Sequence, residues 1–296
     1  MKYFTLISLI FLLLTSSFAQ KIKVKTLANL PPILWESSGL VAGTKHSVWT
    51  HNDSGGEAVL YKIDSTAHII RTVKIIGLRN TDWEDLANDY LGYIYIADIG
   101  NNCNCRKNLK ILKIPHPDSL TLDSVIPEVI NFSYENQNSF PPNKANLNFD
   151  AEALIAYQDS LFIFTKNRTK PYSQKTYIYA LVNKAGPQKA VLYDSLLLKH
   201  THKYRSWLTS ATRHPFQDKI ILLSHKKAWF VEGFRSKKIN LTKTKISGIY
   251  SQKEAIAYDL EGDIWITNEK FKFLRAKISI QKAKSSSSSN TSNITK

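Results

Sequence analysis

The sequence predicts an all-β protein with the fold of a β-propeller, built from five four-stranded blades. Two observations predict this fold. Short runs of apolar residues recur along the chain, each closed by polar turn residues, and no long segment has the periodicity of a helix. The runs also belong to a repeated unit, because similar segments precede and follow each of them. The runs are VWTH, IYIAD, LFIFTK, IILLSH and DIWITN.

Each unit is expected to contain four strands, of which the run is the second. The first strands are SSGLVAG, WEDLAND, AEALIAY, TSATRHP and KEAIAYD. The third strands are AVLYKID, LKILKIP, TYIYALV, AWFVEGF and FLRAKIS. The fourth strands are IIRTVKII, EVINFSY, KAVLYDSLL and NLTKTKIS, and the fifth unit ends before a fourth strand.

The N-terminal segment KIKVKTL, residues 21–27, is the candidate for this missing strand. A propeller closed by the opposite end of its chain leaves no long strand edge exposed. The spacing corresponds to roughly 50 residues per blade, a usual size for such repeats. Two alternatives remain open: a six-bladed ring with a degenerate blade within residues 115–147, and a β-sandwich.

The two ends of the chain are expected to lie outside the propeller domain, residues 20–281. Residues 1–19 have the pattern of a secretory signal peptide, in which an apolar run follows a single lysine and precedes an A-x-A-like cleavage site. The run is too short to span a bilayer. Residues 282–296 form a Ser-rich tail that is expected to be disordered. We therefore expect a secreted or periplasmic protein with no membrane insertion after cleavage.

The chain carries a formal net charge of +16 at pH 7. Its lysines are spread through turns, with short dense patches only at residues 225–227 and 235–238, and no nucleic-acid-binding module is recognisable. A solvated basic surface explains this charge, so we expect no nucleic-acid partner. Membrane-surface binding has little support because no amphipathic basic helix is visible. We expect a monomer.

The chain has two cysteines, Cys103 and Cys105. An exported protein meets oxidising conditions, which favour a disulfide, whereas a bridge between residues two positions apart is strained. A zinc site would need more ligands than the neighbouring sequence offers. A local disulfide and two free thiols are both left open, and neither defines the fold.

The first strands carry a polar residue at one repeat position, two residues before the apolar residue on which we aligned them (Leu40, Leu86, Leu154, Thr212 and Ile256). First strands line the channel of a propeller, so these polar side chains would converge. Carboxylates that converge in a partly desolvated channel need protons or a cation, and ligands with oxygen donors alone suit Ca²⁺. The alternative is that each side chain faces solvent. The predicted calcium ligands are Ser38, Glu84, Glu152, Ser210 and Glu254, with Glu36, Asp82 and Asp150 supporting them from outside.

A second set of polar residues ends the second strands: Asn52, Asp98, Lys166, His225 and Asn268. Their chemistry varies from unit to unit, which suggests a pocket at one end of the channel, and ordinary polar turns are the alternative that stays open. We expect substrate to be bound by Asn52, Arg106, Lys166 and Asn268. The candidate catalytic residues are Asp53, Asp98 and His225.

The order Ser-Glu-Glu-Ser-Glu, one residue per unit, resembles the central calcium site of the calcium-activated nucleotidases, the apyrases. That resemblance implies a five-bladed ring around Ca²⁺. The chain departs from the apyrases in two places: it lacks their Asp-rich motif near the start, and Ser224–Lys227 stands where they have paired arginines.

The phrases WTHNDSGG, DWEDLA and DIGNN, with Arg106 shortly after, resemble more closely a group of exported bacterial β-propeller proteins whose activity is not settled. This resemblance covers chiefly residues 36–115. The Pro-Glu-Pro of that group stands here as Pro115-His116-Pro117.

These patterns predict an exported calcium-binding propeller that hydrolyses a phosphate-bearing small molecule. The metal would polarise a phosphoryl oxygen or activate water. Lys166, His225 and Arg106 would bind the anion, and Asp53 or Asp98 would act as general base. The alternative is a non-catalytic propeller with structural calcium that binds an envelope glycan or protein through the tryptophans Trp49, Trp83, Trp207 and Trp265.

Overall fold

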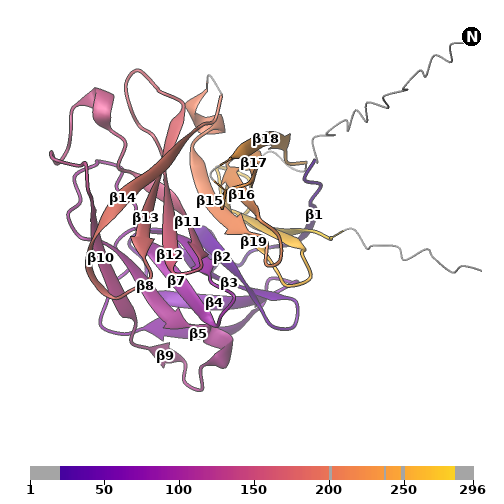
Figure 1. Ribbon diagram of the computed structural model, residues 1–296. Coiled ribbons are helices and arrows are strands. Elements are labelled where there is room, and N and C mark those ends of the chain that lie inside the picture. The colour runs from indigo at the N-terminus through magenta and orange to yellow at the C-terminus, as the bar shows by residue number, and fades with distance from the viewer. Residues whose placement is uncertain (1–20, 200–201, 237, 248–250, 284–296) are drawn as a thin grey trace, which may run out of the picture.

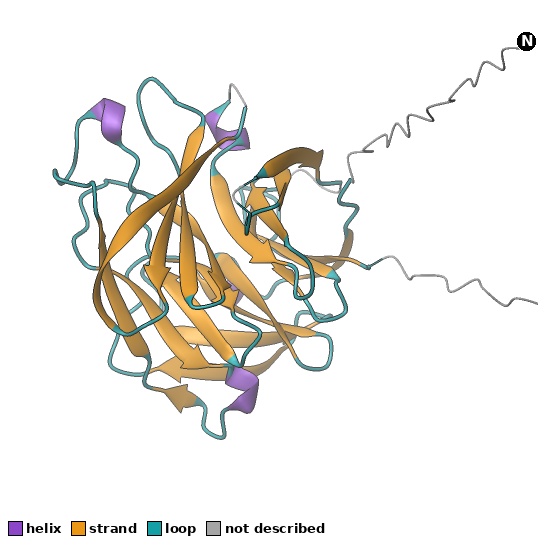
Figure 2. Ribbon diagram, in the orientation of Figure 1, coloured by secondary structure: helices purple, strands orange, loops and turns teal. Residues whose placement is uncertain are grey.

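Strands account for nearly all the regular structure of this computed structural model, and the helices are single short turns (Figure 2). The structure describes residues 21–199, 202–236, 238–247 and 251–283. The predicted signal peptide and most of the predicted Ser-rich tail lie outside these residues. None of the helices in the described part of the chain is long and apolar enough to cross a membrane. The short helices are η1 (Pro32–Leu34), η2 (Pro117–Ser119), η3 (Lys144–Asn146) and η4 (Lys203–Arg205).

The strands form twisted sheets (Figure 1), and the first strands of these sheets contact one another around a common centre, which is the arrangement of a β-propeller. The predicted all-β propeller class is therefore confirmed. The first sheet has the order β2-β3-β4-β5-β9. Its strands are β2 (Ser37–Gly43), β3 (Ser47–Asn52), β4 (Val59–Asp64), β5 (Ile69–Ile75) and β9 (Ser124–Val125).

The next sheet has eight strands, in the order β11-β12-β13-β14-β10-β8-β7-β6. It consists of two antiparallel halves that are joined by parallel pairing of their outer strands, β10 and β14. One half contains β6 (Trp83–Asn88), β7 (Tyr93–Asp98), β8 (Leu109–Pro115) and β10 (Glu128–Tyr134). The other contains β11 (Ala151–Tyr157), β12 (Ser160–Thr165), β13 (Lys175–Val182) and β14 (Gly186–Leu197).

The remaining sheets come from the C-terminal part of the chain and from the N-terminal strand. One contains β15 (Leu208–Arg213), β16 (Lys219–Ser224), β17 (Lys227–Glu232) and β18 (Asn240–Lys245). The other contains β19 (Lys253–Tyr258), β20 (Ile264–Asn268), β21 (Lys277–Gln281) and β1 (Lys25–Asn29). β1 pairs antiparallel with β21, so the two ends of the chain meet in one sheet (Figure 1). β1 begins at Lys25, later than the start of the predicted segment 21–27. Ile22, in the first part of that segment, forms an isolated bridge with Ile246 instead.

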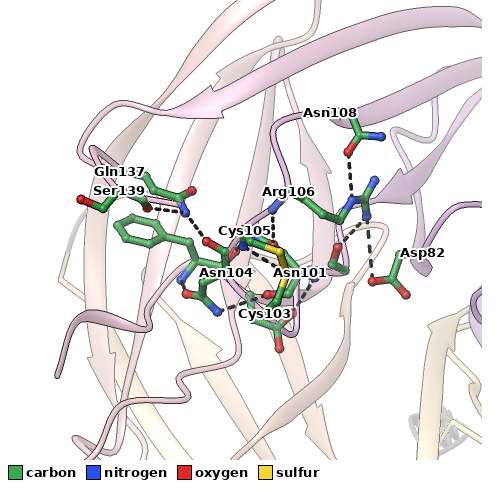
Figure 3. Close-up of a disulfide and its surroundings, with 12 residues drawn as sticks. Asp82, Asn101, Cys103, Asn104, Cys105, Arg106, Asn108, Gln137 and Ser139 are labelled. Carbon is green, nitrogen blue, oxygen red and sulfur yellow. Dashed lines mark hydrogen bonds and ion pairs between the residues drawn. A yellow bond between two sulfur atoms is a disulfide. The ribbon is translucent and has the colours of Figure 1, made fainter. Parts of the chain in front are cut away.

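The stretch 115–147, in which a degenerate blade was an alternative, adds no separate sheet to the described residues. It contributes η2, the short strand β9 at the edge of the first sheet, β10 and η3. The cysteines lie in the loop after β7, where Cys103 and Cys105 form a disulfide (Figure 3). Within the same loop, Asn101 Oδ1 accepts a hydrogen bond of 2.9 Å from the backbone N–H of Arg106.

The core lies between neighbouring sheets, and large aromatic side chains fill it. Trp49 and Trp83 are completely buried in one cluster between the first two sets of strands, and Trp265 is buried in another. These three tryptophans therefore pack the interior and do not form a binding rim. Of the tryptophans predicted for that role, Trp207 alone reaches the end of the channel.

The first strands of the sheets contact one another in a closed cycle: β2, β6, β11, β15, β19 and back to β2. The carboxylate of Asp85 on β6 lies inside this cycle and is fully buried. It accepts hydrogen bonds of 3.0 Å from the backbone N–H groups of Leu86, Leu154 and Ala211, and one of 2.8 Å from Ser210 Oγ. One side chain thus joins β6, β11 and β15. Burial raises the pKa of Asp85, while these donors lower it.

We predict that Asp85→Asn lowers the free energy of unfolding by about 1–3 kcal/mol, because the amide group turns an N–H toward donors that need an acceptor. Urea denaturation of both proteins measures the difference. Asp159→Asn, which changes an exposed residue in the hairpin between β11 and β12, is the matched control and should have no effect. Equal stability of the Asp85 variant and the unaltered protein would contradict this role.

Candidate functional site

A cavity of ≈ 270 Å³ lies at the end of the channel where the first strands begin and the second strands end. We call this end the channel mouth. Acidic side chains dominate its wall, accompanied by three cationic side chains and one tryptophan. The lining residues are Glu36, Ser38, Asp53, Glu84, Asn102, Glu152, Lys166, Arg168, Trp207, His225, Gln252, Glu254 and Glu269.

Four of the predicted calcium ligands line this cavity: Ser38, Glu84, Glu152 and Glu254. Ser38 Oγ donates a hydrogen bond of 2.5 Å to the carbonyl oxygen of Glu84. Ser210 is not among the lining residues, because its hydroxyl bonds Asp85 and accepts a hydrogen bond of 3.2 Å from the backbone N–H of Ile256. The structure therefore brings the carboxylates together and gives Ser210 a position deeper in the ring.

A β-bulge near the start of each first strand explains why the glutamates point into the channel mouth. In three strands the bulged residue, which has no partner on the second strand, is Glu84, Glu152 or Glu254. A bulge re-aims its side chain away from the ladder. In β2 and β15 the bulged residues are Gly39 and Thr209, so Ser38 and Ser210 each lie one residue away from the position we aligned them to. Gly39 has a φ of 56°, which favours glycine at this bulge.

Two of the glutamates are already neutralised by a neighbouring cation. Lys166 Nζ forms an ion pair with Glu152, and His225 Nδ1 lies 3.1 Å from Glu254. Burial opposes the charge on both cations, yet the surrounding carboxylates raise the pKa of Lys166 and that of His225 above their usual values. Both side chains therefore stay protonated more readily than in water.

Glu84 lacks such a partner: among the described residues, no cation lies within ion-pair distance of its carboxylate. The side chain is only 6% exposed. Oxygen atoms of Asp53, Asp82 and Glu84 all lie within 4.8 Å of one another. Arg106 approaches this group to 3.9 Å, at Asp82. We call Asp53, Asp82 and Glu84 the carboxylate triad.

Burial and repulsion by neighbouring carboxylates raise the pKa of every member of the triad. Burial raises the pKa of Asp53 to about 6, and repulsion by Asp82 and Glu254 adds to the shift. The pKa values of Asp82 and Glu84 are raised mainly by burial. On the other side of the cavity, burial and repulsion by Glu254 raise the pKa of Glu269 to about 7. Each member of the triad therefore holds a proton more readily than in water, unless a cation compensates the charge.

Gly100 lets the backbone approach the triad closely. A Cβ atom at this position would overlap the carboxylates of both Glu84 and Asp82. The backbone N–H of Gly100 also donates a hydrogen bond of 3.1 Å to the carbonyl oxygen of Asp82. This contact gives the DIGNN phrase a physical reason for its glycine.

Several residues predicted to bind substrate have structural partners instead. Asn52 Nδ2 donates to the carbonyl oxygen of Ile33 at 2.6 Å, and Asn268 Nδ2 donates to that of Glu269 at 2.9 Å. Neither asparagine lines the cavity.

Asp98 and Arg106 also have partners outside the cavity. The fully buried carboxylate of Asp98 lies 2.7 Å from Arg106 and 3.0 Å from Lys110. Of the three candidate catalytic residues, Asp53 and His225 line the cavity and Asp98 does not.

The sequence analysis did not single out Arg168, Gln252 or Asp85. Arg168 forms an ion pair with Asp150 and lies 4.9 Å from the ring of Trp207, and Gln252 donates to Glu269. Arg168 comes two residues after Lys166, shortly after the end of β12. This closeness to the polar residue that ends the second strand was the signal that could have identified it. Asp85 carries a visible signal too, since it is a charged residue at an inner-strand position that is otherwise apolar or hydroxylic.

The fold and the cavity define a β-propeller with an acidic site at one mouth of its channel. No family model and no curated protein matches the chain. Among solved structures, it is similar to the PQQ-bound aldose sugar dehydrogenase of Streptomyces coelicolor, at 10% identity and a TM-score of 0.48, over 87% of this chain and 97% of that one. It is also similar to a streptogramin B lyase, at 13% identity and a TM-score of 0.42, over 87% and 96% of the two chains. The chain is similar as well to the WD40 repeats of RRP9, at 8% identity and a TM-score of 0.44, over 87% of this chain and 96% of that one. At these TM-scores the likenesses carry no argument about activity.

We predict that the unfolding free energy of the metal-free protein falls, relative to that of Glu269→Gln, as pH rises from about 4.5 to about 7.5. The raised pKa of Glu269, about 7, means that the folded state holds this proton more tightly than the unfolded state. The contribution is therefore complete below the ordinary carboxyl pKa and is lost as pH rises through the folded pKa.

Urea denaturation in a chelator, at several pH values, measures this difference. Comparison with the Gln variant cancels the contributions of other groups to the pH dependence of stability. One such group is His51, whose pKa is lowered to about 4 by burial and whose contribution has the opposite sign. Glu57→Gln, at an exposed position, is the control and should follow the unaltered protein at every pH. A stability difference that does not change with pH would contradict the assignment.

Proposed function

We propose that the protein is an exported five-bladed β-propeller, closed by β1, that binds Ca²⁺ at the channel mouth and hydrolyses a phosphate-bearing small molecule. The blade count is supported by the cycle of five first strands, each of which starts a set of at least four antiparallel strands. The pairing of β1 with β21 supports closure of the ring between the two ends of the chain.

The carboxylate triad is the observation that carries this proposal. Three carboxylates within 4.8 Å of one another need a compensating charge, and one of them, Glu84, is nearly buried. The donors are all oxygen atoms, with no histidine or cysteine among them, which suits a hard cation such as Ca²⁺. Asp53, Asp82 and Glu84 would hold the cation.

The five-residue ring inferred from the repeats remains a proposal in a modified form. Ser38, Glu152 and Glu254 line the same cavity as the triad and are available to complete a calcium shell. Glu152 and Glu254 pair with Lys166 and His225 through one carboxylate oxygen each, which leaves the second oxygen available to a cation. Ser210 would contribute through Asp85, not as a ligand.

A calcium ion bound here would polarise a phosphoryl oxygen or activate water. The protein groups around it have separate roles. Lys166 and Arg168 hold positive charge on the wall of the same cavity, where they would orient an anionic group. His225 is held by Glu254 and has a raised pKa, so it can donate a proton to a leaving oxygen.

The second candidate function is a non-catalytic binding module with structural calcium. Trp207 favours it, because its ring lines the cavity between Lys166, at 5.5 Å, and Arg168, at 4.9 Å. Trp207 is only 9% exposed, so a ligand would contact the part of its ring that reaches the cavity.

We predict that Ca²⁺ raises the melting temperature of the protein relative to a chelator, and that Glu84→Gln abolishes most of this increase. Glu84 is the buried member of the triad, so its loss removes charge that no other group replaces. Glu152→Gln should lower calcium affinity less, because Glu152 is already paired with Lys166. Glu57→Gln is the exposed control.

Calorimetric titration with Ca²⁺ measures the affinity of each variant. An equal loss in the Glu84 and Glu152 variants would favour the complete ring over the triad. Identical melting in Ca²⁺ and chelator would remove the metal site altogether.

We also predict metal-dependent release of phosphate from a phosphate ester or nucleotide, and a loss of kcat of about 10²–10⁴-fold in His225→Gln, the range expected for removal of a general acid. A colorimetric phosphate assay with and without chelator is the measurement. Calcium binding should be retained in this variant, because Asp53, Asp82 and Glu84 stay in place, and this separates proton transfer from metal binding. A calcium-dependent melting temperature without any turnover would favour the binding module.

A further inference from the structure

The turn between β20 and β21 has the sequence Lys-Phe-Lys-Phe-Leu-Arg, residues 270–275, and lies on the channel-mouth side. Its conformation is well defined by its own hydrogen bonds. The backbone N–H groups of Phe271 and Leu274 each donate to the other residue's carbonyl oxygen, at 3.0 and 2.9 Å. The side chain of Phe273 at the tip is 100% exposed. A closed turn of this kind presents its apolar side chains at little cost in conformational entropy.

Further exposed apolar side chains lie beside this turn. The backbone N–H of Lys270 donates to the carbonyl oxygen of Trp35 at 2.8 Å, which ties the turn to the segment before β2. Trp35 is 38% exposed and Ile33 is 53% exposed. We call this surface the mouth patch, and it consists of Ile33, Trp35, Phe271, Phe273 and Leu274.

Cationic side chains accompany the mouth patch. Lys270 Nζ lies 3.5 Å from the ring centre of Trp35, and Lys272 Nζ lies 5.6 Å from that of Phe271. Beside the turn is a groove of ≈ 570 Å³ whose walls include Phe271, Leu274, Arg205 and Lys226. Among the described residues, neither the groove lining nor the turn contains a carboxylate, and the nearest acids are the exposed Glu36, next to Trp35, and those of the channel-mouth cavity.

We propose that the mouth patch docks the protein on an anionic lipid bilayer. Phenylalanine, tryptophan and leucine side chains partition into the interfacial region of a bilayer, while lysine and arginine stay at the level of the phosphate groups. An aromatic turn with lysines beside the rings of Trp35 and Phe271 supplies both interactions. Each basic residue near an anionic surface adds to the attraction. The net charge of the chain, +16, acts in the same direction over longer distances.

The shape of the patch favours lipid over a protein partner. A stable protein interface buries its central aromatic side chains in pockets, within a flat region of complementary shape. Here the largest exposure belongs to the tip of a single turn, and the surrounding cations provide no polar acceptors to match. This docking mode needs no amphipathic helix, which explains why helical periodicity did not reveal it. It does not depend on the calcium site or on hydrolysis.

The test is co-sedimentation with vesicles of phosphatidylglycerol and phosphatidylcholine, compared with vesicles of phosphatidylcholine alone. The protein used begins at Gln20, because it keeps every described strand and lacks the apolar N-terminal run, which would itself bind lipid. We expect binding to the anionic vesicles that weakens with salt. Phe271→Ser with Phe273→Ser, and separately Lys270→Gln with Lys272→Gln, should each weaken it by at least about tenfold.

Phe216→Ser is the matched control, because Phe216 is 76% exposed in the hairpin between β15 and β16, at the other end of the strands. It should leave binding unchanged. Tryptophan fluorescence should shift to the blue on anionic vesicles, and Trp35→Phe should abolish the shift. Equal binding to both kinds of vesicle, equal effects of the Phe273 and Phe216 changes, or self-association through the patch in the absence of lipid would each overturn the proposal.

Discussion

The buried carboxylate of Asp85 is the interaction on which the centre of the propeller depends. Three first strands direct backbone N–H groups at it, so the strands cannot slide along one another without leaving a buried donor unpaired. Asp85 directly follows the bulged residue Glu84, whose side chain enters the channel mouth. One carboxylate therefore joins the first strands, and its neighbour in the sequence lines the candidate site.

The channel mouth concentrates acid within a strongly basic protein. Every buried carboxylate placed there adds to the electrostatic repulsion. Glu152 and Glu254 each have a basic side chain beside them, whereas Glu84 has the other two carboxylates of the triad beside it. Buried carboxylates that repel one another lower the free energy of unfolding, because apolar residues would fill the same space without repulsion. A cation bound at the triad, as proposed, would relieve this repulsion.

The strand pattern of this protein could be predicted because each strand signal is local: apolar runs, polar turns and their repetition. The register of the ring could not, since a bulge shifts pairing by one residue without any change in hydrophobic pattern. Gly39 and Thr209, not Ser38 and Ser210, therefore share the position of the three glutamates. The adjacent acids Glu84 and Asp85 show the same limit. Their sequence indicates that one of them faces the axis, but only tertiary contacts reveal that Asp85 is the buried hub and Glu84 the site residue.

The two ends of the channel are built differently, and this decides from where a ligand can approach the acidic cavity. At the end opposite the mouth, Tyr90 spans between hairpins: its hydroxyl donates to the carbonyl oxygen of Arg213 at 2.7 Å, and the Arg213 guanidinium lies 4.9 Å from its ring. Deeper in the channel, Asp85 and its donors fill the axis. A ligand of the triad must therefore enter through the mouth, the side that also carries the exposed aromatic turn. If that turn rests on lipid, the ligands that reach the cavity most readily are those held close to the membrane surface, and the phosphate groups of lipids and of membrane-bound metabolites have the charge that a calcium site would recognise.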